Sequence, residues 1–181
     1  MDRTKNFAFH SEHIRLIAGL GNPDPKLAAT YHNIGTRALE FLLASSEDHE
    51  WKTKDEFRYV KADSKFFVVP NTFMNESGIA IRHALHYFKV TPESLLVLHD
   101  DTDLPVGDIR IGFGRGSAGH HGIESIIRSL GTNEFWRARI GVRRDDRKEK
   151  AGAFVLKRIR RADETRFEEA FQELRTLLKS D

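Results

Sequence analysis

Residues 94–101, SLLVLHDD, contain four consecutive apolar residues that lead into a histidine and two carboxylates. A short apolar run of this kind predicts a strand that is buried on both faces. A second run, HIRLIAGL at residues 13–20, leads into the turn Gly21-Asn22-Pro23. Two buried strands that each end in polar residues indicate an α/β sheet with its functional groups along one edge.

The rest of the chain alternates between strand and helix patterns. The segments FRYVKA (57–62) and KFFVVP (65–70) are joined by Asp63-Ser64, and this spacing predicts a hairpin. A hairpin is too short for a parallel crossover, so the sheet must be mixed. We expect a single three-layer α/β domain with a mixed, mostly parallel twisted sheet flanked by helices. Further strands are expected at 108–113 and 138–143, and helices from about Gly35, at 77–88, at 123–131 and at 162–179.

Length and composition exclude several classes of protein. The chain has 181 residues, of which 39% are hydrophobic and 31% charged, and this suits one soluble globular domain. No apolar run approaches the ~20 residues that span a bilayer. Cysteine is absent, which excludes a disulfide scaffold, a thiolate nucleophile and a cysteine-ligated metal. We expect residues 1–12 to form a disordered extension, residues 13–181 to form the domain, and the protein to be cytoplasmic.

The charge is unevenly distributed. The net charge is +2, but residues 137–161 contain eleven Lys or Arg and three acids, which makes this segment +8 and the remainder −6. Such a dipolar distribution suits a polyanionic partner, and nucleic acid is therefore a candidate. On charge alone, a solvated charged face without any partner explains the pattern equally well.

Polar residues that can carry chemistry follow the predicted strands. They are Asn22, then His32 and Asn33, and the run from His99 to Asp103. A histidine beside a carboxylate is the minimal apparatus for activating water, because imidazole accepts the proton near neutral pH and the acid orients the ring. We take His32 and Asp100 as such a pair, against the alternative of a histidine that only caps or packs.

Other motifs argue against metals and cofactors. The acids Asp101 and Asp103 lack the remaining spaced ligands of a calcium loop, and His120-His121 lacks a third zinc ligand. The glycine-rich stretch GFGRGSAGHHG (112–122) is neither a Walker motif nor a dinucleotide fingerprint. It predicts a loop that leads into a helix, where free backbone N–H groups can bind a phosphate. The alternative is a mobile surface loop without a ligand. We therefore expect no metal and no cofactor.

Taken together, the motifs resemble peptidyl-tRNA hydrolases of the bacterial type. The resemblance implies a single mixed-sheet α/β domain that cleaves the ester between a peptide and the terminal ribose of tRNA and so recycles tRNA after ribosomal drop-off. We expect a monomer that acts on peptidyl-tRNA without a membrane or an obligate protein partner. The matching segments occur in the family's order: LIAGLGNP (16–23), ATYHNIG (29–35), PNTFMNESG (70–78), VLHDDTDLPVG (97–107), GHHGIESIIRSLG (119–131) and RIGV (139–142).

The resemblance also assigns roles to single residues. It implies that His32 is the catalytic base and Asp100 its orienting acid. The chain departs from the family at His121, where asparagine is usual, and at Gly112, where a basic residue is frequent. The alternative is a catalytically weak relative that binds RNA without hydrolysing it; a different small esterase lacks a serine in a nucleophile elbow. Substrate contacts are expected from Asn22, Met74, Asn75, His120 and His121, and tRNA contacts from Arg110, Arg115, Arg137 and Arg139.

Overall fold

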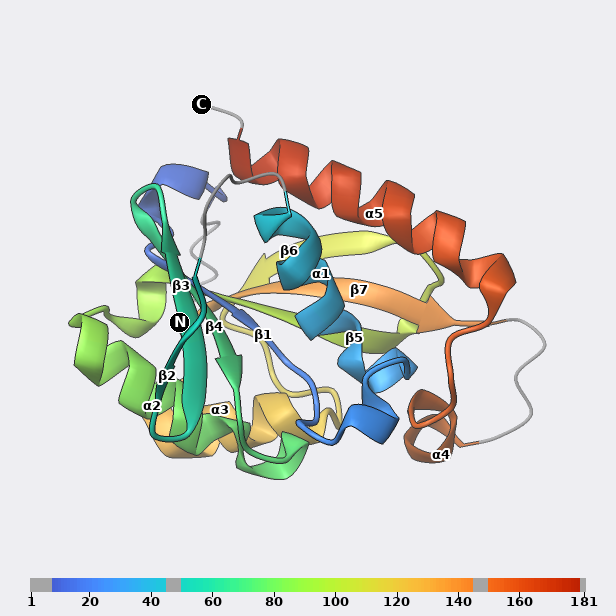
Figure 1. Ribbon diagram of the computed structural model, residues 1–181, viewed down its shortest axis with the longest axis horizontal. Coiled ribbons are helices and arrows are strands. Elements are labelled where there is room, and N and C mark those ends of the chain that lie inside the picture. Colours follow the sequence, from blue (N-terminus) through green and yellow to red (C-terminus); the bar gives the residue numbers. More distant parts are fainter. Residues whose placement is uncertain (1–7, 45–49, 145–149, 180–181) are drawn as a thin grey trace, which may run out of the picture.

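The computed structural model describes residues 8–44, 50–144 and 150–179, and Figure 1 shows how their elements are arranged. The strands are β1 (Leu16–Gly19), β2 (Lys52–Lys54), β3 (Phe57–Ala62), β4 (Lys65–Pro70), β5 (Leu95–Pro105), β6 (Ile109–Phe113) and β7 (Trp136–Arg143). The α-helices are α1 (Ile34–Leu43), α2 (Ser77–Phe88), α3 (His121–Leu130), α4 (Ala151–Val155) and α5 (Arg161–Lys179). Short 3-10 helices include η1 (Ser11–His13), η3 (Tyr31–Asn33) and η4 (Met74–Glu76).

The seven strands form one mixed sheet in the order β2-β3-β4-β1-β5-β7-β6. The four central strands, β4, β1, β5 and β7, run parallel, whereas β2, β3 and β6 pair antiparallel at the two edges. The expected fold class is confirmed. Because the central strands are parallel, their carboxyl ends share one edge of the sheet, and the predicted polar clusters gather there.

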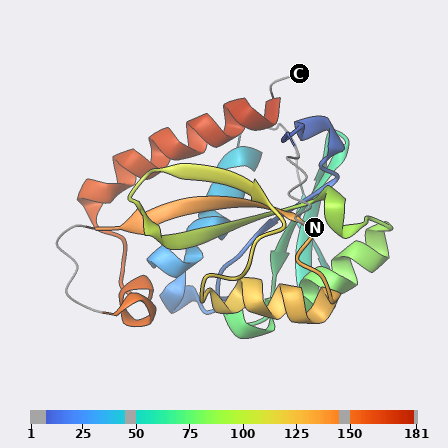
Figure 2. The same cartoon turned by 180° about the vertical axis from the view of Figure 1, so that it is seen from behind.

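Both faces of the sheet are covered by helices, as Figures 1 and 2 show from opposite sides. Alternate residues of β5 serve the two faces, since Leu96 and Leu98 pack with α1 and α5 while Leu95 and Val97 pack with α2 and α3. This alternation explains why the strand appears in the sequence as a continuous apolar run.

The C-terminal helix α5 is amphipathic. Its residues Phe167, Ala170, Phe171 and Leu174 are buried, and its opposite face is charged. Among the described residues, no helix combines the length and the apolar character that crossing a bilayer requires.

Local sequence patterns gave several boundaries correctly, and tertiary pairing changed others. The hairpin β3-β4 and the helix α2 have the predicted bounds. Strand β5 continues past the acids to Pro105 and pairs with β7 across a register shift. Strand β2 and helix α4 were not predicted. Of the expected extension, residues 1–7 lie outside the described residues, whereas Phe9 packs edge-on against Trp136 with ring centroids 5.1 Å apart.

One glycine brings the first helix unusually close to the sheet. A Cβ at Gly35 would lie 2.2 Å from the backbone oxygen of Leu98, so no larger residue fits between α1 and β5. The next residues of the strand are His99 and Asp100. The close approach at Gly35 therefore brings the turn η3, which immediately precedes α1, next to Asp100.

Candidate active site

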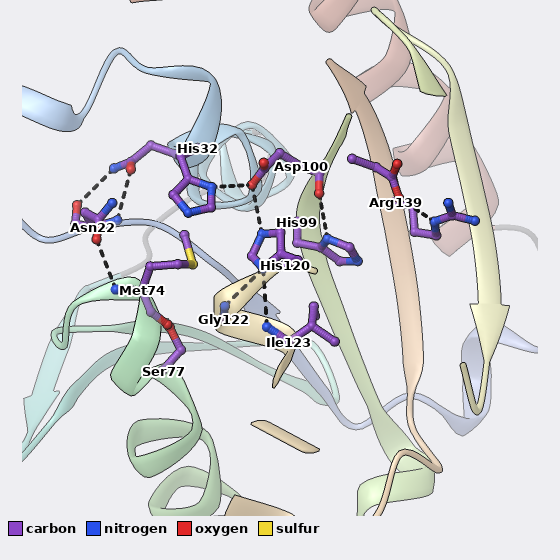
Figure 3. A network of polar contacts seen from close by, with 12 residues as sticks. Asn22, His32, Met74, Ser77, His99, Asp100, His120, Gly122, Ile123 and Arg139 are labelled. Atoms are coloured by element: carbon purple, nitrogen blue, oxygen red, sulfur yellow. Dashed lines mark hydrogen bonds and ion pairs between the residues drawn. The ribbon is translucent and has the colours of Figure 1, made fainter. Parts of the chain in front are cut away.

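A cleft of about 600 Å³ opens at the carboxyl ends of the parallel strands. Its walls come from the turn after β1, from η3 and η4, from β5, from the glycine-rich loop and from α4. Figure 3 shows the polar network at its base. The expected substrate residues and the expected base and acid all line this cleft, namely Asn22, His32, Met74, Asn75, Asp100, His120 and His121.

His32 and Asp100 form the expected pair. Nδ1 of His32 lies 2.8 Å from Oδ1 of Asp100, and both side chains are buried. A carboxylate can only accept, so Nδ1 carries the proton and Nε2 keeps its lone pair. The pair therefore has the tautomer that a general base needs.

Asp100 serves two histidines at once. Its Oδ1 also lies 2.9 Å from Nε2 of His120, and Figure 3 shows both rings converging on this one carboxylate. Burial by itself would raise the pKa of Asp100, but His120 and then His32 outweigh burial and hold that pKa below its ordinary value. The carboxyl group is therefore ionised at neutral pH and can stabilise an imidazolium beside it.

His120 has both ring nitrogens engaged within the protein. Its Nδ1 accepts from the backbone N–H groups of Gly122 and Ile123, at 3.1 and 3.3 Å, and so caps the N-terminus of α3. Its Nε2 must then carry the proton that it donates to Asp100. The sequence suggested substrate binding for His120, but these bonds leave its nitrogens no further role. His120 instead connects α3 to the acid.

His99 is a buried neighbour of this network. Its Nδ1 donates to the backbone oxygen of Asp100 at 2.8 Å, and its ring packs edge-on against His120. Burial, followed by the nearby His120, lowers the pKa of His99 well below its ordinary value. His99 is therefore neutral at neutral pH and acts as a wall of the site. Sequence reasoning noted its position in the motif but gave it no role.

The asparagine side of the cleft is built by reciprocal hydrogen bonds. The side chain of Asn33 accepts from the backbone N–H of Asn22 and donates to its backbone oxygen, both at 2.9 Å. Oδ1 of Asn22 in turn accepts from the N–H of Met74 at 3.0 Å. Met74 is buried and Asn75 is exposed at the rim. The turn after β1 is thus fixed to both η3 and η4.

The four candidate arginines differ in their surroundings. Arg137 is only 3% exposed, and its guanidinium donates to the backbone oxygens of Gly116 and Arg115. This burial contradicts a surface role, because the side chain anchors the glycine-rich loop from beneath. Arg139 is part-exposed and its Nε donates to Oδ2 of Asp101 at 2.6 Å.

The remaining two arginines, Arg110 and Arg115, are exposed. Arg110 lies directly opposite Arg139 on the neighbouring strand. Arg115 covers Gly112, since a Cβ there would meet its Nε at 3.3 Å. The side chain of Arg115 therefore occupies the space above a strand position where the resemblance leads one to expect a basic residue.

The loop residue His121 is strongly exposed. Its side chain is 76% accessible, and its Nδ1 lies 3.8 Å from Oε2 of Glu124. Ala118, three residues earlier in the same loop, has φ +49°, a left-handed conformation that favours glycine. His121 lines the cleft from its rim and takes no part in the hydrogen-bond network around Asp100.

Three atoms that could bind a metal ion lie within 4.8 Å of one another, one each from His32, Asp100 and His120. The tautomer of His120 does not suit a metal, because its Nδ1 accepts two backbone bonds and its Nε2 carries the proton. A protonated nitrogen has no lone pair to give a cation. The donor set fits a hydrogen-bonded network better than a metal centre.

Comparison with known proteins assigns the family. A family model described as peptidyl-tRNA hydrolase matches residues 16–180. The chain belongs to the peptidyl-tRNA hydrolase family. It is 44% identical over 147 residues to the peptidyl-tRNA hydrolase of Lactobacillus gasseri, which covers 79% of each chain. It is 39% identical over 145 residues to that of Coxiella burnetii, covering 79% of this chain and 77% of the relative.

A solved structure confirms the fold-level likeness. The crystal structure of peptidyl-tRNA hydrolase from Acinetobacter baumannii superposes with a TM-score of 0.82 at 28% identity, covering 95% of this chain and 92% of the other. As a peptidyl-tRNA hydrolase family member, the chain is a hydrolase, and the sequence resemblance is confirmed.

The α4 wall of the cleft was not foreseen from the sequence. Ala151, Gly152, Val155 and Leu156 line it, and Leu156 is half exposed. This five-residue helix lies within the basic segment 137–161, and it contains a glycine, so no strong helical pattern marks it. An apolar wall in the same cleft as the asparagines can accommodate the non-polar part of a bound substrate.

Proposed function

We propose that the chain hydrolyses the ester bond between the peptide and the terminal ribose of peptidyl-tRNA, with His32 as the general base. The observation that carries this proposal is the bond from Nδ1 of His32 to Asp100, which leaves Nε2 as a base in a cleft. Ester hydrolysis needs an oriented water, donors for the oxyanion and no cofactor.

The reaction follows from these groups. Nε2 of His32 removes a proton from water while the water oxygen attacks the ester carbonyl, and Asp100 stabilises the imidazolium that forms. The tetrahedral intermediate then expels the ribose oxygen, which receives from His32 the proton that the water lost. The products are a free peptide carboxyl group and a tRNA with a free ribose hydroxyl.

The two asparagines are proposed to recognise the peptide. Oδ1 of Asn22 is occupied by Met74, so the NH₂ group of the same amide is the part that can donate to the substrate. Asn75 is exposed on the same side of the cleft, where its amide can pair with both a peptide N–H and a C=O. An unacylated aminoacyl ester would instead present an ammonium group there.

The tRNA is proposed to bind through Arg110, Arg115 and Arg139 at the rim. Arg110 and Arg139 are cross-strand neighbours, and Asp101 pairs with only one of these two like charges, so a further anion between them is favourable. A phosphate of the acceptor end supplies this anion. We further propose that the protein is a cytoplasmic monomer without an obligate protein partner, and size-exclusion chromatography tests the monomer.

The decisive experiment measures release of tRNA from N-acyl-aminoacyl-tRNA. General-base catalysis is typically worth ~10²- to 10⁴-fold, so His32→Ala should lower turnover by at least about two decades and leave tRNA affinity nearly unchanged. His83→Ala is the matched control, because His83 also pairs with a carboxylate, Glu56, but is not among the cleft-lining residues. Near-normal turnover of His32→Ala at neutral pH would refute the mechanism.

The same assay separates the enzyme from a catalytically weak RNA-binding relative. Intact tRNA affinity without turnover in the unmodified protein would favour the binder. The complete base–acid pair favours the enzyme, because a protein that only binds RNA has no use for it.

A further inference from the structure

The segment that joins α4 to α5 runs alongside the turn that carries His32. The N–H of Tyr31 donates to the backbone oxygen of Lys157 at 3.2 Å, and the N–H of Ile159 donates to that of Ala29 at 2.9 Å. An isolated antiparallel bridge lies between these two bonds. Two stretches more than a hundred residues apart in the sequence are thus paired beside the catalytic base.

The side chain of Tyr31 continues this connection into α5. It is 1% exposed, its hydroxyl donates to Oδ2 of Asp163 at 2.5 Å, and it accepts from the N–H of Arg160. Its ring stacks on Phe154 of α4 with centroids 4.7 Å apart. Burial, followed by the bond to Asp163, raises the pKa of Tyr31, so its hydroxyl keeps the proton that it donates.

The turn itself has little stability of its own. Helix η3 is three residues long, and its N-cap residue Thr30 makes no capping bond with its side chain. Short 3-10 turns of this kind depend on tertiary contacts. Asn33 anchors one end of the turn to Asn22, and Tyr31 anchors the other end. His32 lies between these two anchors.

We propose that Tyr31 and Asp163 are a positioning pair for the catalytic base, through which α5 holds the ring of His32 in line with Asp100. This inference rests on the proposed role of His32. The hydroxyl–carboxylate bond fixes the residue that immediately precedes the base, so loosening it lets the 2.8 Å contact to Asp100 fluctuate. Small displacements of a catalytic group are costly, since about 1 Å can lower the rate ~100-fold.

The test compares three variants in the tRNA-release assay. Tyr31→Phe keeps the stacked ring and removes only the hydroxyl, and we expect kcat to fall about tenfold with KM unchanged. Asp163→Ala also removes the ion pair of Asp163 with Arg144, so its loss should be at least as large. Asp163→Asn retains an acceptor oxygen for the Tyr31 hydroxyl and should keep at least about half of the normal kcat. Thermal unfolding checks that each variant is folded, and if Asp163→Ala is not, the other two still decide.

Glu164→Gln is the matched control. Glu164 is the next residue of α5 and pairs with Arg37 of α1 at 2.7 Å, so this variant removes the charge of a neighbouring interhelical ion pair without touching Tyr31. Its kcat should be unchanged. The proposal of a positioning pair is overturned if the kcat of Tyr31→Phe stays within twofold of normal. It is also overturned if Asp163→Asn lowers kcat as much as Asp163→Ala does. If His32→Ala is fully active, the proposed base itself fails, and this outcome is distinct from both.

Discussion

The cleft has an inner wall and a rim that differ in how their side chains are held. The inner wall consists of His32, His99, Asp100 and His120, and the rim includes His121. His120 and His121 are adjacent in sequence, yet the side chain of the first is 8% exposed and that of the second 76%. Each inner-wall group is bonded to another, so one change disturbs several. Rim groups such as Asn75 and His121 take no part in this network, so their changes should be smaller and specific to one part of the substrate.

The largest effect in this comparison is expected for Asp100→Asn. An amide can still orient the ring of His32 but cannot stabilise its cation, so we expect turnover to fall by about one to two decades, less than for His32→Ala. tRNA affinity should hardly change. Turnover and affinity are measured separately, by single-turnover release and by equilibrium binding. Full turnover in Asp100→Asn would mean that the inner wall has no electrostatic role.

The next effect separates the two adjacent histidines. His120→Ala removes a hydrogen bond to Asp100 and uncaps two amides of α3, so kcat should fall about tenfold and stability by about 1 kcal/mol. His121→Ala should change both by much less. Steady-state kinetics and urea unfolding of the pair make the comparison. Equal effects in the two variants would abolish the distinction between wall and rim.

A third prediction concerns discrimination at the rim. Asn75→Ala removes an exposed amide that we assign to the peptide, so the preference for peptidyl over unmodified aminoacyl ester should narrow by several-fold. The ratio of kcat/KM for the two substrates is the measurement. Met74, buried beside it, offers no such polar contact. An unchanged ratio would remove Asn75 from the peptide site.

The fourth prediction uses the three arginines around the glycine-rich loop. Arg115→Gln and Arg139→Gln should each reduce the slope of log affinity against log salt by about one unit, because each removes a phosphate contact. Arg137→Gln should leave the slope unchanged, since its guanidinium is buried under the loop. A salt titration of tRNA binding distinguishes the variants. A reduced slope only in Arg137→Gln would reverse our assignment.

Sequence patterns predicted local structure better than they predicted the role of each polar atom. The hairpin and α2 followed from periodicity, which depends on neighbours in the chain. The continuation of β5 to Pro105 depends on its pairing with β7, which no local pattern contains. Likewise, Arg137 and Arg139 are two residues apart on β7 and share one face of the strand. Arg137 is buried because the glycine-rich loop folds over it, and no local pattern in the sequence shows this.

The smallest effect is expected for His121→Asn. Neutral imidazole offers one donor and one acceptor, as an amide does, so activity at neutral pH should be preserved or slightly raised. Steady-state kinetics of the two proteins at neutral pH make the measurement. A tenfold loss at neutral pH in the variant would give His121 a function of its own and make the rim as demanding as the inner wall.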